Sequence, residues 1–332
     1  MKSWVFYLLF TTVFVLVGWF ANTAYHLPRS SNNPIAQARP TPLAKYSIEA
    51  LAGTNFTPSN IEIGKVLKTD PKFTSYEFSF KFTPDLSGNT KNVTGLINIP
   101  NGIGPFPTVV MFRGYVDQKK YVVGEGTQRA AEVFAKNGYV TIAPDFLGYG
   151  NSDPEAGNIF ESRFQTYVTA ATLLKSVDSI DNWDKKNVFI WGHSNGGQIA
   201  LTVLEITGSE FPTVLWAPVS KPFPFSILAY TDESDDHGKL IRDELSRFEE
   251  DYDVEKFSLT NYLDRIKAPV QLNQGTNDDA VPTNWSDTLS KILKKNGNDI
   301  TYIKYPGANH NLQPSWNQAV LTNINFFNKM SK

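Results

Sequence analysis

A serine lies at the centre of the run Gly192-His193-Ser194-Asn195-Gly196-Gly197. Before this run comes a short apolar stretch (188–191) typical of a buried strand, and after it comes one typical of a helix (199–206). A G-x-S-x-G turn between strand and helix lifts the serine oxygen clear of the sheet, and the glycines leave room for the bend. The N–H of Asn195 opens the helix and faces a developing oxyanion. The pattern predicts a nucleophilic Ser194; an ordinary glycine-rich turn is the alternative.

A serine nucleophile needs a general base, and the chain has four histidines. His26 lies in a proline-rich stretch and His237 in an acid-rich one. His193 belongs to the turn itself, where we expect its side chain to point away from the serine's pocket. His310, which follows an apolar stretch near the C-terminus, is therefore the predicted base. A surface-loop histidine without a catalytic role is the alternative.

The base needs an acid that orients it, and two neighbouring aspartates are candidates. Asp278 and Asp279 both follow a predicted strand at 270–273. The chain order serine, acid, histidine favours this place. A polar turn can also use either carboxylate for local capping alone. The residues by themselves leave both aspartates open.

The second oxyanion donor is expected in the loop after an early strand, here the run Met111-Phe112-Arg113-Gly114-Tyr115. Tyr115 is the candidate donor, through its backbone N–H or its hydroxyl; the alternative is that it only lines the pocket. For Arg113 we expect a structural salt bridge, with a carboxylate of the substrate as the alternative partner.

Alternating and continuous apolar stretches predict the elements that position these residues. Strands are expected at 76–82, 93–99, 108–112, 139–143, 188–191, 213–216, 270–273 and 301–304, and helices at 130–136, 160–177, 199–206, 285–293 and 316–327. Antiparallel strands followed by repeated strand–helix pairs imply a mixed, mostly parallel sheet with helices on both faces. An insertion at 218–266 is expected to form a cap. Its acidic face would either attract a cationic group, such as the amino terminus of a peptide, or be a solvated helix surface.

The strand, turn and helix around Ser194 resemble the nucleophile elbow of the α/β-hydrolase fold. The doubled glycine at 196–197 resembles the catalytic domain of the prolyl oligopeptidase family, and the similarity covers roughly 76–330. This resemblance implies an α/β-hydrolase fold. The run 274–282 is similar to the family pattern G-x-x-D-x-x-V-P, and this similarity assigns the acid to Asp278. His310 lies at the position of the family's histidine loop, after the last core strand. Some of these relatives use a tyrosine hydroxyl as an oxyanion donor, which supports Tyr115. A loop at 145–152 resembles the family's D-x-x-G-x-G-x-S loop, and we expect it to be structural.

We therefore expect a serine hydrolase that cleaves a peptide or ester bond through a Ser-His-Asp triad and an acyl-enzyme. The resemblance favours a prolyl oligopeptidase-like serine peptidase, and a carboxylesterase of the same fold is the alternative. An alternative of another class is a membrane-tethered, non-catalytic binding protein on a hydrolase scaffold. We expect no cofactor and no metal, since cysteine and the usual phosphate-loop and zinc motifs are absent from the sequence. A net charge of -2 gives no electrostatic case for nucleic acid.

The N-terminal region is expected to lie outside the catalytic domain. Residues 4–20 carry no charge and are mostly apolar, at the short end of the length that spans a membrane. This predicts a signal anchor, or a signal peptide, at 1–21, a proline-rich linker at 22–45 and a catalytic domain at 46–332. We expect a single membrane-anchoring helix with an extracytoplasmic catalytic domain; secretion after signal cleavage is the alternative.

Overall fold

A computed structural model of the chain describes residues 39–332 except 232, 233 and 235. Residues 1–21, predicted as an anchor, and most of the predicted linker lie outside the described residues. Within those that are described, no helix is both long enough and apolar enough to cross a membrane. A compact unit runs from Thr41 to Lys332. Leu43, inside the stretch predicted as linker, is buried in this unit.

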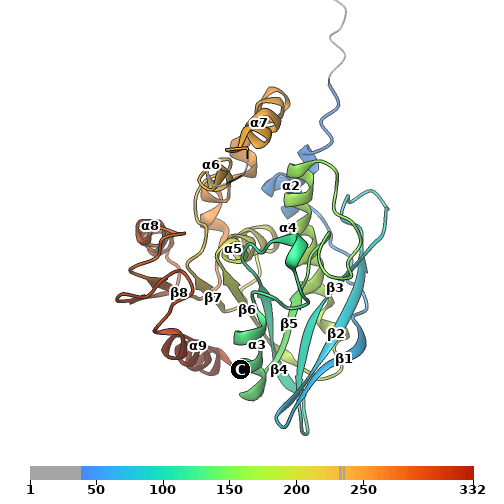
Figure 1. The fold of residues 1–332 in the computed structure, drawn as a ribbon, viewed down its shortest axis with the longest axis vertical. Helices are drawn as coiled ribbons and strands as arrows, with labels where there is room; N and C mark the ends of the chain where they lie inside the picture. The colour runs from blue at the N-terminus through green and yellow to red at the C-terminus, as the bar shows by residue number, and fades with distance from the viewer. Residues whose placement is uncertain (1–38, 232–233, 235) are drawn as a thin grey trace, which may run out of the picture. The chain divides into compact units, whose positions relative to one another are not determined.

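A mixed sheet forms the centre of the unit (Figure 1). Among the described residues it has nine strands in the order β1-β2-β3-β5-β4-β6-β7-β8-β9. The strands are β1 (Glu62–Asp70), β2 (Phe73–Phe82), β3 (Lys91–Pro100), β4 (Phe106–Phe112), β5 (Val140–Pro144), β6 (Trp183–His193), β7 (Thr213–Trp216), β8 (Val270–Gly275) and β9 (Ile300–Tyr305). Pairing is antiparallel from β1 to β5 and parallel from β5 to β9. The predicted mixed, mostly parallel sheet is confirmed.

Helices cover both faces of the sheet. They are α2 (Ile48–Ala52), α3 (Gln128–Lys136), α4 (Ile159–Ser176), α5 (Asn195–Thr207), α6 (Phe225–Leu228), α7 (Lys239–Asp251), α8 (Thr283–Lys295) and α9 (Trp316–Met330). Short 3₁₀ turns are η1 (Ala44–Tyr46), η2 (Gln118–Lys120), η3 (Val177–Ser179), η5 (Val254–Phe257), η6 (Leu259–Asn261) and η7 (Leu263–Arg265).

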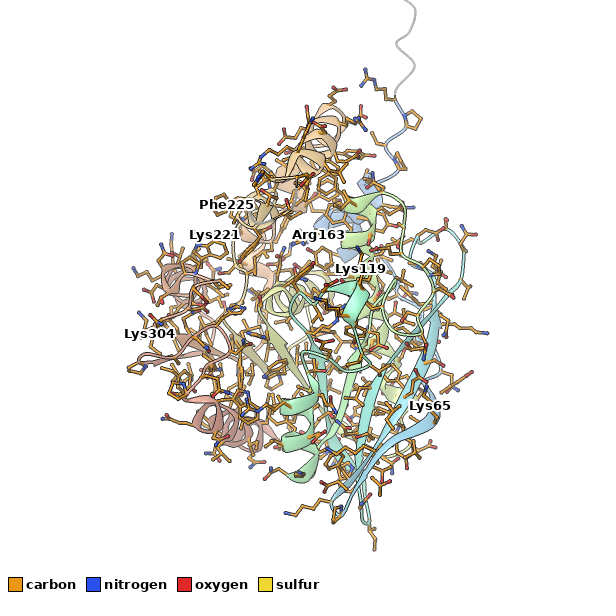
Figure 2. The ribbon with its side chains drawn as sticks, in the orientation of Figure 1. Lys65, Lys119, Arg163, Lys221, Phe225 and Lys304 are labelled. Carbon is orange, nitrogen blue, oxygen red and sulfur yellow. The ribbon has the colours of Figure 1, made fainter. Side chains whose placement is uncertain are left out.

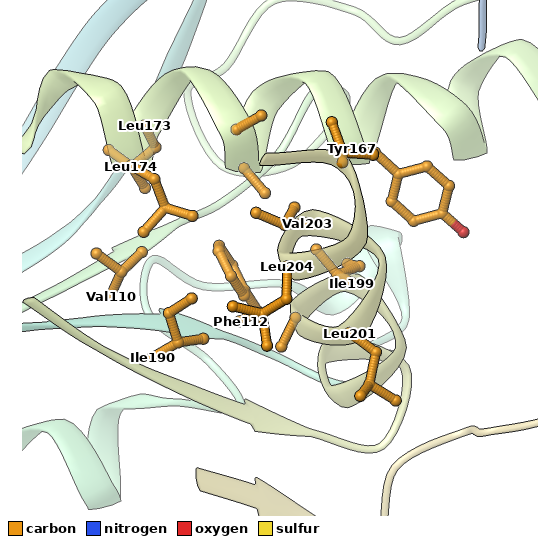
Figure 3. Packing of buried hydrophobic residues seen from close by; sticks show 14 of the residues in the cluster. Val110, Phe112, Tyr167, Leu173, Leu174, Ile190, Ile199, Leu201, Val203 and Leu204 are labelled. Carbon is orange, nitrogen blue, oxygen red and sulfur yellow. The ribbon is translucent and has the colours of Figure 1, made fainter. Parts of the chain in front are cut away.

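The hydrophobic core has one layer on each face of the sheet. Strand β4 is apolar at consecutive positions because its side chains enter both layers. Val110 and Phe112 belong to the cluster under α4 and α5, which Figure 3 shows from close by. Val109 and Met111 belong to the cluster under α3 and α9. Successive side chains of a strand point to opposite faces, so a strand covered on both sides must be apolar at every position.

Strand β1 is absent from the sequence-based predictions. Its residues 62–69 are exposed and show no alternation of apolar and polar side chains. Backbone pairing with β2 holds it at the edge of the sheet. Side-chain patterns predict burial, and this strand buries almost none of its side chains.

The insertion between β7 and β8 contains α6, α7 and the turns η5 to η7. Phe248 of α7 packs against Phe160 and Phe164 at the start of α4, with ring centroids 5.2 and 6.1 Å away. The acidic residues at the end of α7 (249–251) are exposed. Aromatic packing therefore fixes the insertion to α4, while the acidic end of α7 faces solvent.

Candidate active site

Ser194 is the single residue between β6 and α5, and its backbone is held in an unusual conformation. Its φ of 55° and ψ of -120° lie in a region that non-glycine residues rarely occupy, at a cost of about 1–3 kcal/mol. Two contacts hold it there: the Ser194 N–H donates to the Trp216 carbonyl at 2.9 Å, and its carbonyl accepts from the Val219 N–H at 3.0 Å. This is the sharp strand-to-helix turn that the sequence predicts.

The glycines of this turn are required because backbone passes close to them. A Cβ built on Gly196 would lie 2.0 Å from the carbonyl oxygen of Phe112, and one on Gly192 would lie 2.5 Å from the carbonyl oxygen of Gly196. Neither distance is compatible with a side chain. The turn can thus pack against β4 only because Gly196 lacks a side chain, and it can close on itself only because Gly192 lacks one.

His310 lies in the loop after β9 and is paired with Asp278, which lies in the loop after β8. Nδ1 of His310 is 3.0 Å from Oδ2 and 3.1 Å from Oδ1 of Asp278. The Asp278 side chain is fully buried, whereas Asp279 is exposed. The loop itself selects this orientation, because the N–H groups of Ala280 and Val281 donate to Oδ1 at 3.0 and 2.8 Å.

The surroundings of Asp278 keep it ionised. Burial by itself raises the pKa of Asp278, but the bonds from His310, Val281 and Ala280 outweigh burial, so the pKa lies below its usual value of 3.8. An ionised carboxylate accepts the Nδ1–H of the imidazole and leaves Nε2 free to accept a proton.

His193 joins the serine turn to the histidine loop. Its Nε2 is 3.1 Å from the carbonyl oxygen of His310, and the two imidazole rings are 4.7 Å apart. Burial, and then the charge of His310, lowers the pKa of His193 to about 4, so the ring is neutral at neutral pH. A neutral ring donates Nε2–H to the carbonyl. His193 thus contacts the backbone of His310 and also lines a separate cavity of about 480 Å³ with Trp191 and Trp216.

The loop after β4 lies directly beside Ser194. A Cβ on Gly114 would be 3.1 Å from Cβ and 3.7 Å from Oγ of Ser194. Tyr115 and Asn195 both line a cavity of about 160 Å³ next to this turn. The side chain of Tyr115 is 82% exposed. The structure therefore places the residues predicted as oxyanion donors at the same cavity.

Arg113 has a structural environment, but the expected salt bridge is not the interaction that holds it. Its side chain is buried, and its terminal nitrogens donate to the carbonyls of Gly114 and Asp145, each at 3.0 Å. The guanidinium lies over the rings of Tyr149 and Tyr121, 3.9 and 4.9 Å from their centroids. Flat aromatic faces and carbonyl oxygens thus hold the two terminal nitrogens of this guanidinium in place of a paired carboxylate, while its buried Nε has no hydrogen-bond partner.

Asp145 is also structural, as the sequence predicts. Its side chain is fully buried and accepts bonds from the hydroxyls of Tyr121 and Thr94, at 2.6 and 2.8 Å. It ties the loop after β5 to the loop that carries Arg113. Burial raises the pKa of Asp145 despite these bonds.

Arg163, on the first turns of α4, also lines the cavity beside Ser194 and is missing from the sequence-based predictions. It belongs to no motif, and only folding brings it to α5. Among the residues that the structure describes, no three His, Asp or Glu side chains are grouped as metal ligands would be.

The sequence of the chain is similar to known peptidases and esterases. The sequence model of the prolyl oligopeptidase family matches residues 126–332. Dipeptidyl peptidase family member 6 of Caenorhabditis elegans is 25% identical over 66% of this chain and 32% of its own length. An acetyl esterase of Xylanibacter ruminicola is 22% identical over 71% of this chain and 56% of its own length. The chain thus spans about a third and about half of the lengths of these relatives.

Among solved structures, acetyl xylan esterase 1 from Thermoanaerobacterium superposes with a TM-score of 0.61 at 16% identity. That match covers 88% of this chain and 95% of the esterase. At this identity the superposition shows the fold alone, which is the α/β-hydrolase fold.

Proposed function

Because the chain belongs to the prolyl oligopeptidase family, we propose that this serine hydrolase cleaves a peptide bond through an acyl-enzyme formed on Ser194. The pairing of His310 with buried Asp278, at the sheet edge where Ser194 is held in its strained turn, is the observation that carries the proposal. The carboxyl ends of the parallel strands β6, β8 and β9 lie at one edge, so the three loops converge.

In the proposed mechanism, Nε2 of His310 accepts the proton of the Ser194 hydroxyl while the serine oxygen attacks the carbonyl carbon. Asp278 holds the imidazole by Nδ1–H and stabilises the imidazolium. When the tetrahedral intermediate collapses, His310 returns the proton to the leaving amine. Water, activated by the same imidazole, then attacks the acyl-enzyme and releases the acid and free Ser194.

The oxyanion is held by backbone N–H groups in this proposal. Asn195 is the first residue of α5, so its N–H has no carbonyl partner one turn earlier within the helix. The N–H of Tyr115 is the proposed second donor, supported by the closeness of Gly114 to Ser194. Each such donor contributes about 10²–10³ to kcat in related chemistry.

A carboxylesterase is the second candidate. The matched acetyl esterase covers 71% of this chain, and the same Ser-His-Asp chemistry cleaves esters, whose leaving alkoxide needs less assistance from the imidazole. The choice depends on what the cavity beside Ser194 accepts, not on the triad.

The test compares short aminoacyl amides with acyl esters of the same acyl group, using the native chain and Ser194→Ala. Amide turnover that disappears in Ser194→Ala supports the peptidase; turnover of the esters alone supports the esterase. A fluorophosphonate probe that fails to label Ser194 in folded protein would overturn both and favour a binding protein.

We also propose that residues 1–21 anchor the chain in a membrane with the catalytic unit outside the cytoplasm. The uncharged run 4–20 supports this. Mass spectrometry of the mature protein decides it: an intact leader supports the anchor, and cleavage after it shows a secreted form.

A further inference from the structure

The loop that carries His310, residues 309–313, follows a strand at the edge of the sheet. In the part of the chain that the structure describes, β9 is the last strand of the sheet and pairs only with β8. Figure 2 shows Lys304 of this strand at the margin of the unit. Within the loop, the side-chain oxygen of Asn309 accepts the N–H groups of residues 311 and 313, at 3.1 and 3.0 Å. These bonds shape the loop but do not attach it to the rest of the fold.

Two hydrogen-bonded contacts attach the loop to other segments, among the residues that the structure describes. One is the pairing of the His310 imidazole with Asp278, at 3.0 Å. The other is the bond from Nε2 of His193 to the carbonyl oxygen of His310, at 3.1 Å. Leu312 adds a packing contact, because it is buried in the core layer under α3 and α9. Of the two hydrogen-bonded contacts, only the one from His193 holds the backbone of His310.

Packing is a poor substitute for this bond, because the loop borders a hollow. Asn311 and Gln313 line the cavity of about 480 Å³ that His193 also lines. Side chains at the wall of a cavity have no partner atoms on the hollow side, so dispersion contacts restrain them less. The position of the His310 backbone thus depends on a directional contact more than on close packing.

The surroundings of His193 aim its donor at the carbonyl. A carbonyl oxygen only accepts, so Nε2 must carry the proton. The centroid of the imidazole is 6.2 Å from that of Trp191 and 6.4 Å from that of Trp216. Trp216 is itself fixed, since its indole N–H donates to Oδ1 of Asn323 at 2.7 Å and its carbonyl accepts the N–H of Ser194. The aromatic cluster therefore orients the ring that contacts the histidine loop.

The bond joins the nucleophile and the base by a short route. His193 and Ser194 are consecutive residues, so one peptide bond and one hydrogen bond connect Ser194 to the carbonyl of His310. A hydroxyl passes its proton to an imidazole only when their heavy atoms are within about 2.6–3.2 Å. A displacement of about 1 Å from such a geometry costs a rate factor of about 10².

We propose that His193 is a positioning residue, whose Nε2–H holds the backbone of His310 so that the imidazole stays within reach of the Ser194 hydroxyl. The inference rests on the proposed function, because it needs His310 to be the general base. His193 acts through His310 and exchanges no proton with the substrate.

Two replacements of His193 separate the hydrogen bond from the packing of the ring. Glutamine places an amide N–H near the Nε2 position but has no ring, whereas phenylalanine keeps a ring among the tryptophans but has no donor. We expect His193→Gln to retain most of kcat. His193→Phe should lower kcat by about 10- to 100-fold, with KM changed less than about threefold. A role in packing alone predicts the reverse order, with the larger loss in His193→Gln.

The assay is steady-state hydrolysis of a p-nitrophenyl ester or p-nitroanilide by the full chain, under conditions where urea unfolding shows each variant to be folded. Asn311→Ala is the matched control, because Asn311 follows His310 directly and its side chain is exposed. It should change kcat less than about threefold.

The outcomes separate this inference from the function on which it rests. If a fluorophosphonate labels Ser194 in the native chain, the hydrolase stands. The role of His193 is then overturned if His193→Phe keeps native kcat, or if His193→Gln loses as much kcat as His193→Phe. No turnover and no labelling in the native chain overturn the proposed function itself. If His193→Phe does not fold, His193→Leu, which also lacks a donor, replaces it in the comparison.

Discussion

Replacing Asp278 by asparagine is the sharpest test of the proposed triad, because the hydrogen bonds around this side chain dictate how an amide must sit. Oδ1 accepts from the N–H groups of Ala280 and Val281, while Oδ2 accepts from Nε2 of Gln274 at 2.9 Å. An asparagine keeps both backbone bonds only if its oxygen takes the Oδ1 position. Its NH₂ group then occupies the Oδ2 position.

In that orientation the amide faces His310 with a donor. Nδ1 of His310 lies 3.0 Å from the Oδ2 position and 3.1 Å from the Oδ1 position, where the oxygen already accepts two backbone N–H groups. The NH₂ group at the Oδ2 position therefore favours the imidazole tautomer that carries its proton on Nε2. An imidazole protonated at Nε2 has no lone pair for the proton of Ser194. We expect kcat to fall by about 10⁴-fold, which corresponds to roughly 5.5 kcal/mol of transition-state stabilisation.

The same NH₂ group also meets the NH₂ of Gln274. Rotation of the Gln274 amide cannot relieve this contact without loss, because its Oε1 accepts from Ser286 at 2.7 Å and its Nε2 donates to the carbonyl of Val281 at 3.1 Å. One buried donor pair is left unsatisfied, so Asp278→Asn should lower the free energy of unfolding by about 1–3 kcal/mol.

The assay is steady-state hydrolysis of a p-nitrophenyl ester or p-nitroanilide, with urea unfolding in parallel. Asp279→Asn is the matched control, since its side chain is exposed one residue away, and it should change kcat less than about threefold. The assignment would be refuted if Asp278→Asn retained more than about a tenth of native kcat. It would also be refuted if Asp279→Asn lowered kcat as strongly as Asp278→Asn does.

Three further predictions concern residues around the nucleophile. The pKa of His193 is about 4 in the folded chain and 6.5 in the unfolded chain. Between pH 4 and pH 6.5 the His193 imidazole is therefore protonated mainly in the unfolded chain. Stability should thus fall from pH 6.5 to pH 4, by up to about 3 kcal/mol more than in His193→Gln, as urea unfolding at several pH values would show. Gly196→Ala should abolish activity and lower the free energy of unfolding by about 3 kcal/mol or more, because its methyl group would meet the carbonyl of Phe112. Gly157→Ala is the control: its methyl group would enter open space, so activity and the free energy of unfolding should barely change. Tyr115→Phe should lower kcat less than about threefold if its N–H is the oxyanion donor; a loss of about 10²-fold would assign the hydroxyl instead.

Residues close together along the chain were predictable wherever local sterics decide their conformation. The turn around Ser194 is one case, because the strand, the two close-packed glycines and the helix each give a recognisable sequence pattern within a few residues of Ser194. Strands β4, β5 and β7 are another, because they are buried on both faces and carry mostly apolar side chains. Strand β1 was not predicted because its side chains are exposed and show no alternation of apolar and polar residues.

What lies across the fold was decided by tertiary structure. Asp278 and Asp279 have the same chemistry and adjacent positions, so residue type does not separate them, and the resemblance to a family pattern was needed to favour one. In the structure, two backbone N–H groups and an imidazole from 32 residues further along select Asp278. His193 was expected to point away from the serine's pocket, but its contact with the backbone of His310 could not be predicted from the sequence.

The sequence by itself therefore indicated the class of chemistry and the nucleophile, Ser194, because the nucleophile turn is formed by a short run of consecutive residues, a serine and its neighbouring glycines. Only the tertiary structure decided that His310 pairs with Asp278 and that His193 contacts the backbone of His310. These contacts join loops that follow different strands of the sheet, and no local pattern along the chain encodes them.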